Sequence, residues 1–274
     1  MSSSARSAAA APSKVLTVIP ARLASQRLPG KPLKDIAGKT LVQRVWEQGC
    51  KARCISRLIV ATDSEEIRQV ALGFGAEVMM TSPEITTGSQ RVAAVWNELK
   101  HEGWDYVMNL QGDMPFIKPE LLEQCMSFFE SRREQFDMCT VATPILDEAT
   151  FRSPNDVKVV VSERHQGLYF SRAPIPHSRD GAKLRYVTPG GAEIEVFGFK
   201  HFGLYAFRTD ALGLFENPDQ SPLEQVEKLE QLRLLERGLR IGVCVVPPDL
   251  TADSIEVDTP DDLDRSCLIA KKIS

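Results

Sequence analysis

Buried strands alternate with amphipathic helices along the first half of the chain. Continuous apolar runs are typical of strands covered on both faces of a parallel sheet. Between them, apolar residues recur at helical spacing, as in Leu41, Val42 and Val45. The expected strands are 14–21, 57–63, 77–81 and 106–113, and the expected helices are 40–52, 64–76, 89–103 and 118–133. This order predicts an α/β fold, a mostly parallel open sheet with helices on both faces.

The second half of the chain has shorter apolar runs. They predict strands at 138–145, 157–162, 167–172, 201–208 and 241–248, with a Gly-rich β segment protruding between 179 and 198. Residues 221–238 predict one helix, opened by a capping box of Ser221 and Glu224 with Pro222 between them. A final helix is expected within 257–273. No internal repeat or long linker divides the chain, so residues 14–274 are predicted to form a single domain.

Composition restricts the class of protein. The 274 residues are 43% apolar and 26% charged, with a net charge of -4, which argues against a nucleic-acid partner. The six cysteines form no CxxC pair and are expected to be buried free thiols in a reducing cytoplasm. Residues 1–13 are of low complexity and are expected to be a disordered tail. No run reaches the roughly 20 apolar residues of a membrane helix, so a cytoplasmic protein is predicted.

One loop gathers three cations directly after the first expected strand. The stretch VIPARLASQRLPGKPL, residues 18–33, holds Arg22, Arg27 and Lys31 and is here named the cationic loop. Guanidinium groups and backbone N–H groups in such a loop can bind phosphate oxygens. The alternative is that the three cations are solvated loop residues. The loop is not a Walker A motif, because no serine or threonine follows Lys31.

Eight blocks in order resemble the 3-deoxy-manno-octulosonate (Kdo) cytidylyltransferases. They are IPARLASQRLPGKPL, IVATDSEEI, TTGSQRVAAV, NLQGDMP, LYFSRAPIP, HFGLYAFR, SPLEQVEKLEQLRLLERG and VDTPDDL. The resemblance covers nearly the whole chain. It implies a fold like that of nucleotide-diphospho-sugar transferases, CTP as donor, Mg²⁺ as cofactor, and a homodimer built from the protruding β segment. About 165–210 is then the acceptor and dimerisation segment.

The resemblance also implies roles for individual residues. Lys31, Arg22 and Asp113 would be catalytic, with the cations holding the triphosphate. Asp113 and Asp258 would be the Mg²⁺ ligands, which suits the preference of this ion for carboxylate oxygens. From the residues alone, Asp113 could instead be a turn aspartate, and Asp258 could belong to the start of the last helix. The nucleotide-binding set implied is Ala21, Arg22, Arg27, Lys31, Thr87, Gly88, Ser89, Arg91 and Gln111.

The implied acceptor contacts lie in the second half of the chain. Arg172 could bind a sugar carboxylate with two hydrogen bonds, while His201 and Tyr205 could bind its hydroxyls. Three of the acceptor residues could instead have purely structural roles. His201 could be a hydrogen-bonded strand histidine, Tyr205 a core aromatic residue and Glu224 a helix-capping residue. The acceptor set implied is Arg172, His201, Tyr205, Glu224, Gln225 and Glu227.

Three positions depart from the family pattern. Ile85 stands where a histidine is usual, Gln90 where an acid is usual, and Met114 where a glutamate is usual. The expected reaction is attack by the anomeric hydroxyl of Kdo or a close analogue on the α-phosphorus of CTP, with release of pyrophosphate, for lipopolysaccharide biosynthesis. The alternatives are a nucleotidyltransferase for another acidic sugar, such as 8-amino-Kdo or a nonulosonate, and a nucleotide-binding homologue without turnover.

Overall fold

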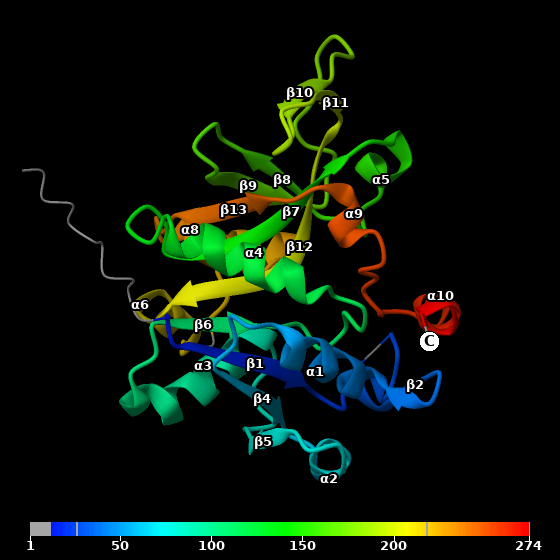
Figure 1. Cartoon of the computed structure of the whole chain (residues 1–274). Coiled ribbons are helices and arrows are strands. Elements are labelled where there is room, and N and C mark those ends of the chain that lie inside the picture. The colour runs from blue at the N-terminus through cyan, green and yellow to red at the C-terminus, as the bar shows by residue number, and fades with distance from the viewer. Residues whose placement is uncertain (1–11, 26, 218, 274) are drawn as a thin grey trace, which may run out of the picture.

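The computed structural model describes residues 12–25, 27–217 and 219–273. Its centre is a nine-stranded sheet in which the path β13-β7-β12-β6-β1-β4-β5 is extended by β8 and β9 (Figure 1). The bounds of these strands are β1 Val15–Ala21, β4 Arg57–Thr62, β5 Glu77–Met80, β6 Tyr106–Asn109, β7 Met138–Ile145, β8 Lys158–Val161, β9 Gly167–Ser171, β12 Gly198–Arg208 and β13 Ile241–Val245.

Most strands of the sheet run in one direction. β1 is parallel to β4 and β6, β4 to β5, and β13 to β7. β12 is antiparallel to both β6 and β7, and β8 and β9 form an antiparallel pair. The predicted fold class, a mostly parallel open α/β sheet, is therefore confirmed. The parallel strands β1, β4 and β6 end at one edge of the sheet, where ligands of such folds bind.

Helices cover both faces of the sheet because the strands are apolar on both sides. Val15 and Ile19 of β1 pack in one core with α1 and α4, whereas Leu16 and Val18 pack in a second core with α3. Figure 1 shows α1 and α4 in front of the sheet. The longer helices are α1 Leu41–Lys51, α2 Glu65–Gly73, α3 Gly88–Leu99, α4 Pro119–Glu130 and α10 Pro260–Ile273.

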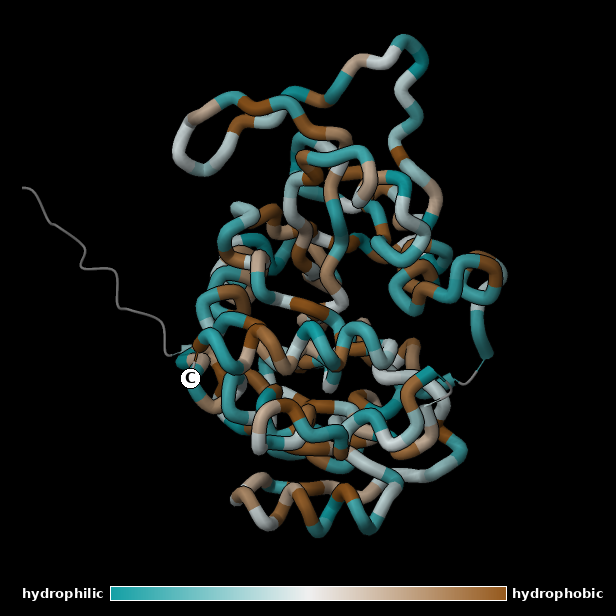
Figure 2. The backbone as a smooth tube through the Cα atoms, turned by 90° about the vertical axis from the view of Figure 1, so that its right-hand side faces the viewer, coloured by the Kyte–Doolittle hydropathy of each residue, from teal (hydrophilic) through white to brown (hydrophobic). Residues whose placement is uncertain are grey.

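Short elements connect this framework. The short helices are η1 Lys31–Leu33, η2 Lys100–Glu102, η3 Gly213–Phe215, α5 Glu148–Arg152, α6 Thr209–Leu212, α7 Pro222–Glu227, α8 Leu232–Glu236 and α9 Pro248–Thr251. Two hairpins pair β2 Asp35–Ile36 with β3 Lys39–Thr40, and β10 Leu184–Val187 with β11 Glu193–Val196. The β10–β11 hairpin is the predicted protruding segment, and both views show it extending away from the sheet (Figures 1 and 2).

The prediction of one helix over 221–238 is wrong. Helix α7 ends at Glu227, and Lys228 adopts a left-handed conformation with φ 57° before α8 begins. The physical reason lies in the buried leucines. Leu229 and Leu234 both enter the α3-side core, although a continuous helix would point them about 140° apart at 100° per residue. The break lets both side chains face the same core.

All six cysteines are free thiols, as predicted, but only Cys125, Cys139 and Cys244 are buried. Cys50 is exposed, and Cys54 and Cys267 are partly exposed. Most of the predicted tail lies outside the described residues, and the single domain of 14–274 stays a prediction. Within the described ranges, no helix has both the length and the apolar character needed to cross a membrane.

We expect Gly112→Ala to destabilise the fold. A Cβ atom at Gly112 would lie 2.7 Å from the backbone oxygen of Pro20, so β1 and the loop after β6 would have to separate. Such overpacking typically costs about 1–3 kcal/mol. Urea denaturation measures the change.

The matched control is Gly213→Ala, because nothing lies within 4 Å of a Cβ atom there and its φ of -56° suits any residue. An unchanged free energy of unfolding in Gly112→Ala would show that the two segments can separate without cost.

Candidate active site

A cleft of about 710 Å³ opens at the edge where β1 and β6 end. One wall is the cationic loop, and the opposite wall is formed by α7 and the turn before α8. The N-terminus of α3 and the loop after β6 lie between them. The lining residues are Pro20, Ala21, Arg22, Ser25, Arg27, Lys31, Pro32, Thr86, Thr87, Gly88, Arg91, Gln111, Gly112, Asp113, Gln220, Glu224, Lys228, Glu230 and Asp258.

Lys31 joins two carboxylates that are far apart in the sequence. Its Nζ atom lies 2.9 Å from Asp113 Oδ2 and 2.8 Å from Asp258 Oδ1. Burial lowers the pKa of Lys31, but the two carboxylates raise it by more, so the pKa stands above its ordinary value. Burial likewise raises the pKa of Asp258, and Lys31 and Arg27 lower it by more. Lys31 and Asp258 are therefore both charged at neutral pH.

The local sequence explains why these groups meet. Val257 N–H donates to the backbone oxygen of Asp113 at 2.9 Å, which fixes Asp258 beside the loop after β6. A small apolar cluster then joins the cationic loop to the last helix through Leu28, Val257 and Ala270. Thr259 and Asp262 exchange hydrogen bonds at the start of α10. Asp258 therefore lies at the start of the last helix, as the local sequence suggested, and also lines the cleft.

The two arginines of the cationic loop differ in their contacts. Arg27 is 64% exposed and pairs with Asp258 Oδ2 at 2.8 Å. Arg22 is also exposed and donates to the backbone oxygen of Thr86 at 3.0 Å, which links the loop to the segment before α3. Both guanidinium groups line the cleft and keep N–H groups for an anionic ligand.

The first turn of α3 forms the floor of the cleft. Thr87 caps the helix by accepting a hydrogen bond from Gln90 N–H, while Gln90 Oε1 accepts from Thr87 N–H. Gly88 lines the cleft, whereas Ser89 is fully buried and donates its N–H to Glu230 Oε2 at 2.9 Å. The positive end of the helix dipole therefore faces the cleft.

Arg91 extends beneath this floor. It is only 2% exposed, pairs with Asp63 Oδ2 at 3.0 Å and donates to the backbone oxygen of Ile85 at 3.2 Å and to the hydroxyl of Thr81. Burial lowers the pKa of Arg91 below its usual value. Its contacts hold the Ile85 segment against the sheet, so its role in the structure includes support of the cleft.

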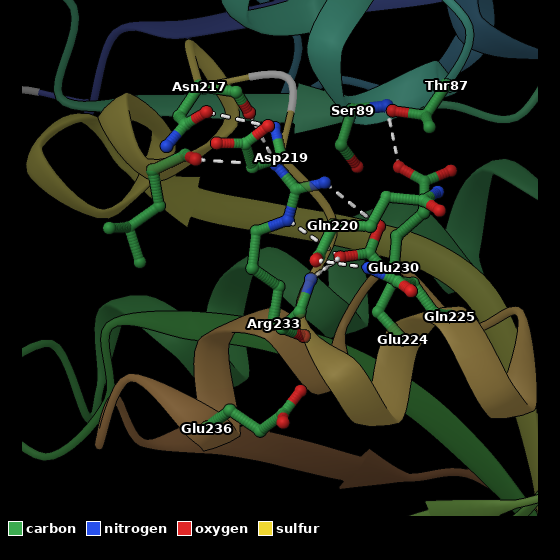
Figure 3. Close-up of polar contacts among 12 residues, drawn as sticks. Thr87, Ser89, Asn217, Asp219, Gln220, Glu224, Gln225, Glu230, Arg233 and Glu236 are labelled. Atoms are coloured by element: carbon green, nitrogen blue, oxygen red, sulfur yellow. Dashed lines mark hydrogen bonds and ion pairs between the residues drawn. The ribbon is translucent and has the colours of Figure 1, made fainter.

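A buried ion pair stiffens the opposite wall (Figure 3). Glu224 and Arg233 are each 1% exposed and make two hydrogen bonds of 2.8 and 3.0 Å. Glu224 also accepts from Ser221 N–H at 3.2 Å, which is part of the predicted capping box at the start of α7. Arg233 in turn binds the backbone oxygen of Asn217. Glu224 therefore lines the cleft as a residue already paired with Arg233.

The remaining implied acceptor residues lie behind the cleft wall. Glu227 Oε2 accepts from the N–H of Arg172, and the Arg172 side chain binds the backbone oxygens of Glu227 and Pro154. Gln225 is exposed and binds the backbone oxygen of Gln220. These contacts join β9 to α7, and none of the three side chains lines the cleft.

His201 and Tyr205 stack on each other inside the protein, with ring centroids 5.6 Å apart. Burial lowers the pKa of His201 to about 3, so its imidazole is neutral and bonds Thr140 Oγ1 at 2.9 Å. Tyr205 donates its hydroxyl to Gln231 Oε1 at 3.1 Å, and burial raises its pKa. His201 is therefore a hydrogen-bonded strand histidine and Tyr205 a core aromatic residue, the structural alternatives to acceptor binding. Neither ring lines the cleft.

Several cleft residues were not foreseen from the sequence. Glu230 and Lys228 stand in the turn that breaks the predicted helix, and Gln220 precedes α7. Glu256 does not line the cleft, but burial of its carboxyl and the charge of Asp113 raise its pKa to about 7. The prediction of one continuous helix over 221–238 gave no reason to place Glu230 in the cleft. The only indication in the sequence was that Glu230 lies in the same family-like segment as Glu224.

Comparison with known proteins decides the family. A family model described as Cytidylyltransferase matches residues 16–241. The chain is 45% identical over 252 residues to 3-deoxy-manno-octulosonate cytidylyltransferase of Syntrophotalea carbinolica, covering 92% of this chain and 96% of that protein. The chain belongs to the cytidylyltransferase family. It is also 40% identical to 8-amino-3,8-dideoxy-manno-octulosonate cytidylyltransferase of Shewanella sp. (strain ANA-3), again over 92% and 96% of the two proteins.

Solved structures agree with this membership. The fold matches CMP:2-keto-3-deoxy-manno-octonic acid synthetase in complex with CTP, with a TM-score of 0.82 and 34% identity, over 96% of this chain and 100% of that chain. A 4-diphosphocytidyl-2C-methyl-D-erythritol synthase from Anaerococcus prevotii shares 10% identity at a TM-score of 0.57, which shows the fold alone.

The three departures from the family pattern leave the described contacts of the cleft intact. Ile85 accepts a hydrogen bond from Arg91 through its backbone oxygen, which any residue could supply. Gln90 completes the capping box of α3 with its side-chain oxygen, as an acid would. Met114 is 1% exposed and packs in the core. In this cytidylyltransferase these positions support the cleft without lining it.

We expect Arg233→Met to destabilise the protein by about 3–5 kcal/mol, because it leaves the Glu224 carboxylate buried without its counter-ion. The double variant Glu224→Gln with Arg233→Met removes both charges and should recover much of that loss. Thermal and urea unfolding of the three proteins measure the difference. Equal stability of Arg233→Met and the unchanged protein would contradict a buried ion pair.

Proposed function

We propose that this protein transfers CMP from CTP to the anomeric hydroxyl of a 3-deoxy-ulosonic acid, Kdo or a close analogue, and releases pyrophosphate. The observation that carries this proposal is the meeting of Arg22, Arg27 and Lys31 with Asp113 and Asp258 at one end of the cleft. The named activities of the relatives support the donor and the acceptor class. The product would serve lipopolysaccharide biosynthesis.

The cations would act on the leaving group. Pyrophosphate leaves with growing negative charge, and fixed cations stabilise that charge most in the transition state. Lys31 keeps its proton because of the two carboxylates beside it. Arg22 and Arg27 would bind the phosphate oxygens through guanidinium N–H groups, and the N-terminus of α3 would contribute its dipole. No histidine lines the described part of the cleft, so we do not assign the deprotonation of the acceptor hydroxyl to a histidine.

The carboxylates would hold Mg²⁺. Asp113 and Asp258 converge on one point, which the Lys31 ammonium occupies, and Asp113 Oδ1 is buried without a hydrogen-bond partner among the described residues. Two hard oxygen donors fit Mg²⁺, which usually takes its other ligands from phosphate and water. No group of three or more acidic, His or Cys side chains that could hold a metal occurs in the described ranges. The ion would neutralise charge on the α-phosphate and lower the pKa of the acceptor hydroxyl.

The β10–β11 hairpin supports the proposed homodimer. It extends away from the sheet, and Leu184 and Val187 on it are 39% and 60% exposed. Apolar side chains on a protruding hairpin are typical of a surface that another protein covers. Assembly through this hairpin would place the acceptor segment near the two-fold axis.

Two other functions compete with this proposal. One is transfer of CMP to a different acidic sugar, which the 8-amino-sugar relatives make concrete. The other is nucleotide binding without turnover. The Lys31–Asp113–Asp258 cluster argues against the second, because a protein that only binds nucleotide needs no acid pair facing the phosphates.

We expect Lys31→Ala to lower kcat roughly 100- to 1000-fold in a pyrophosphate-release assay with CTP and Kdo, the scale of one lost contact to developing charge. Lys34→Ala is the matched control, because Lys34 is a nearby lysine outside the cleft. Turnover by the unchanged protein must need both substrates. Full activity in Lys31→Ala would remove Lys31 from the reaction, and no turnover by the unchanged protein would favour the binding function.

Asp113→Asn should abolish activity that depends on Mg²⁺, because an amide binds the ion more weakly than a carboxylate. EDTA should stop the unchanged enzyme, and added Mg²⁺ should restore it. Asp249→Asn, at an exposed aspartate, is the control. A rate that EDTA does not change would contradict the metal assignment.

A further inference from the structure

Lys228 is a cation on the wall of the cleft that faces the cationic loop. Four described side chains of this wall line the cleft: Gln220, Glu224, Lys228 and Glu230. Glu224 is neutralised by Arg233, and Glu230 accepts the N–H of Ser89 (Figure 3). Within the described ranges, the Lys228 ammonium has no ion pair and no hydrogen bond. This side chain is therefore free to bind an anionic group of a ligand.

The backbone of Lys228 is strained. Its φ of 57° and ψ of 45° lie in the left-handed region, where glycine or asparagine is the usual residue at the end of a helix. Strained residues of this kind concentrate at binding and active sites, where the surrounding structure holds them. A long cationic side chain at a position that suits glycine therefore indicates a use for that side chain.

The neighbours of Lys228 fix it on both sides. Arg172 Nε donates to the backbone oxygen of Glu227 at 3.0 Å, and Glu227 Oε2 accepts from the Arg172 N–H at 3.0 Å. On the other side, Leu229 is 6% exposed and packs in the α3-side core. The Lys228 N–H donates to the backbone oxygen of Glu224 at 2.8 Å. Arg172 thus holds the peptide that leads into Lys228.

The geometry of phosphoryl transfer decides which substrate reaches this wall. The attacking and leaving oxygens lie roughly in line, on opposite sides of the phosphorus atom. Because the cationic loop would hold the leaving pyrophosphate, the acceptor would approach from the opposite wall. An acidic sugar then brings its carboxylate to a wall where Glu230 would repel it and Lys228 would attract it.

We propose that Lys228 binds the carboxylate of the acceptor acid and that Arg172 positions Lys228 for this contact. The inference rests on the proposed function and gives the acceptor carboxylate a partner in the cleft. The guanidinium of Arg172 is bonded to backbone oxygens and does not line the cleft, so it acts through Lys228. The ammonium supplies N–H donors to the carboxylate oxygens, which a neutral sugar lacks.

Lys228→Met tests the contact, because methionine is unbranched and uncharged. In a pyrophosphate-release assay with CTP and Kdo, or with the 8-amino acid where that is the faster acceptor, we expect the KM for the acceptor to rise roughly 10- to 100-fold. This is the scale of one hydrogen bond to a charged group. The KM for CTP and kcat should stay nearly unchanged, since the contact is made equally before and during the reaction.

Two further variants serve as controls. Lys228→Arg should keep the KM for the acceptor close to that of the unchanged enzyme, because the charge remains. Lys51→Met, at an exposed lysine at the end of α1, should leave all constants unchanged.

Lys228→Gly separates the side chain from the backbone. Glycine suits the left-handed conformation, so this variant should unfold at nearly the same temperature as the unchanged protein. It should nevertheless show the same rise in the KM for the acceptor as Lys228→Met. A normal KM in Lys228→Gly would reduce Lys228 to a structural role.

A double-mutant cycle tests the role of Arg172. Arg172→Met should also raise the KM for the acceptor, but adding it to Lys228→Met should raise the KM no further, because both residues serve one contact. Effects that multiply would overturn the positioning role, since Arg172 would then act independently of Lys228.

An unchanged KM for the acceptor in Lys228→Met, or a loss that falls on the KM for CTP, would overturn the role of Lys228 and leave the proposed function standing. Absence of turnover by the unchanged protein with CTP and either acid would instead overturn the proposed function, and with it this inference.

Discussion

The ammonium of Lys31 between Asp113 and Asp258 is the interaction on which the cleft depends. Two carboxylates that face one point repel each other, and a cation must lie between them for both to be ionised. Lys31 supplies that cation from the loop after β1, while the acids come from the loop after β6 and from the segment before α10. One charge cluster therefore ties together three parts of the chain and places them in the cleft.

The sheet makes this meeting possible. Because β1 and β6 are parallel neighbours, their carboxyl ends lie side by side, and Gly112 allows the loop after β6 to approach Pro20. The helices on the two faces then fix the walls: α3 directs its N-terminus into the cleft, and α7 is held by the Glu224–Arg233 pair. The substrates would add charge to a site whose own charges are already positioned, so little reorganisation would be needed during the reaction.

Much of this could be read from the sequence, and what could not has a physical cause. The apolar runs of β1, β4 and β6 and the start of α10 are local signals, and the structure follows them. The break at Lys228 depends on which core Leu229 and Leu234 enter, which is a tertiary effect. For the same reason the sequence pointed to His201 and Arg172 and missed Glu230: side chains on one strand or helix differ in exposure only once their neighbours are known. The sequence resemblance implied a metal-binding role for Asp258, whereas the local pattern alone indicated the start of a helix.

The most direct test of the central idea, a cation and two acids arranged for transfer of a cytidylyl group, is nucleotide selection by the unchanged enzyme. Pyrophosphate release is measured with CTP, UTP, ATP and GTP in turn, with Kdo and with its 8-amino analogue. Turnover with CTP well above that with the other three nucleotides is the predicted result. Ala21 and Gly88 line the cleft, and their backbone groups would select a pyrimidine whatever side chains stand at Ile85 and Gln90. Equal rates with CTP and a purine nucleotide would contradict it.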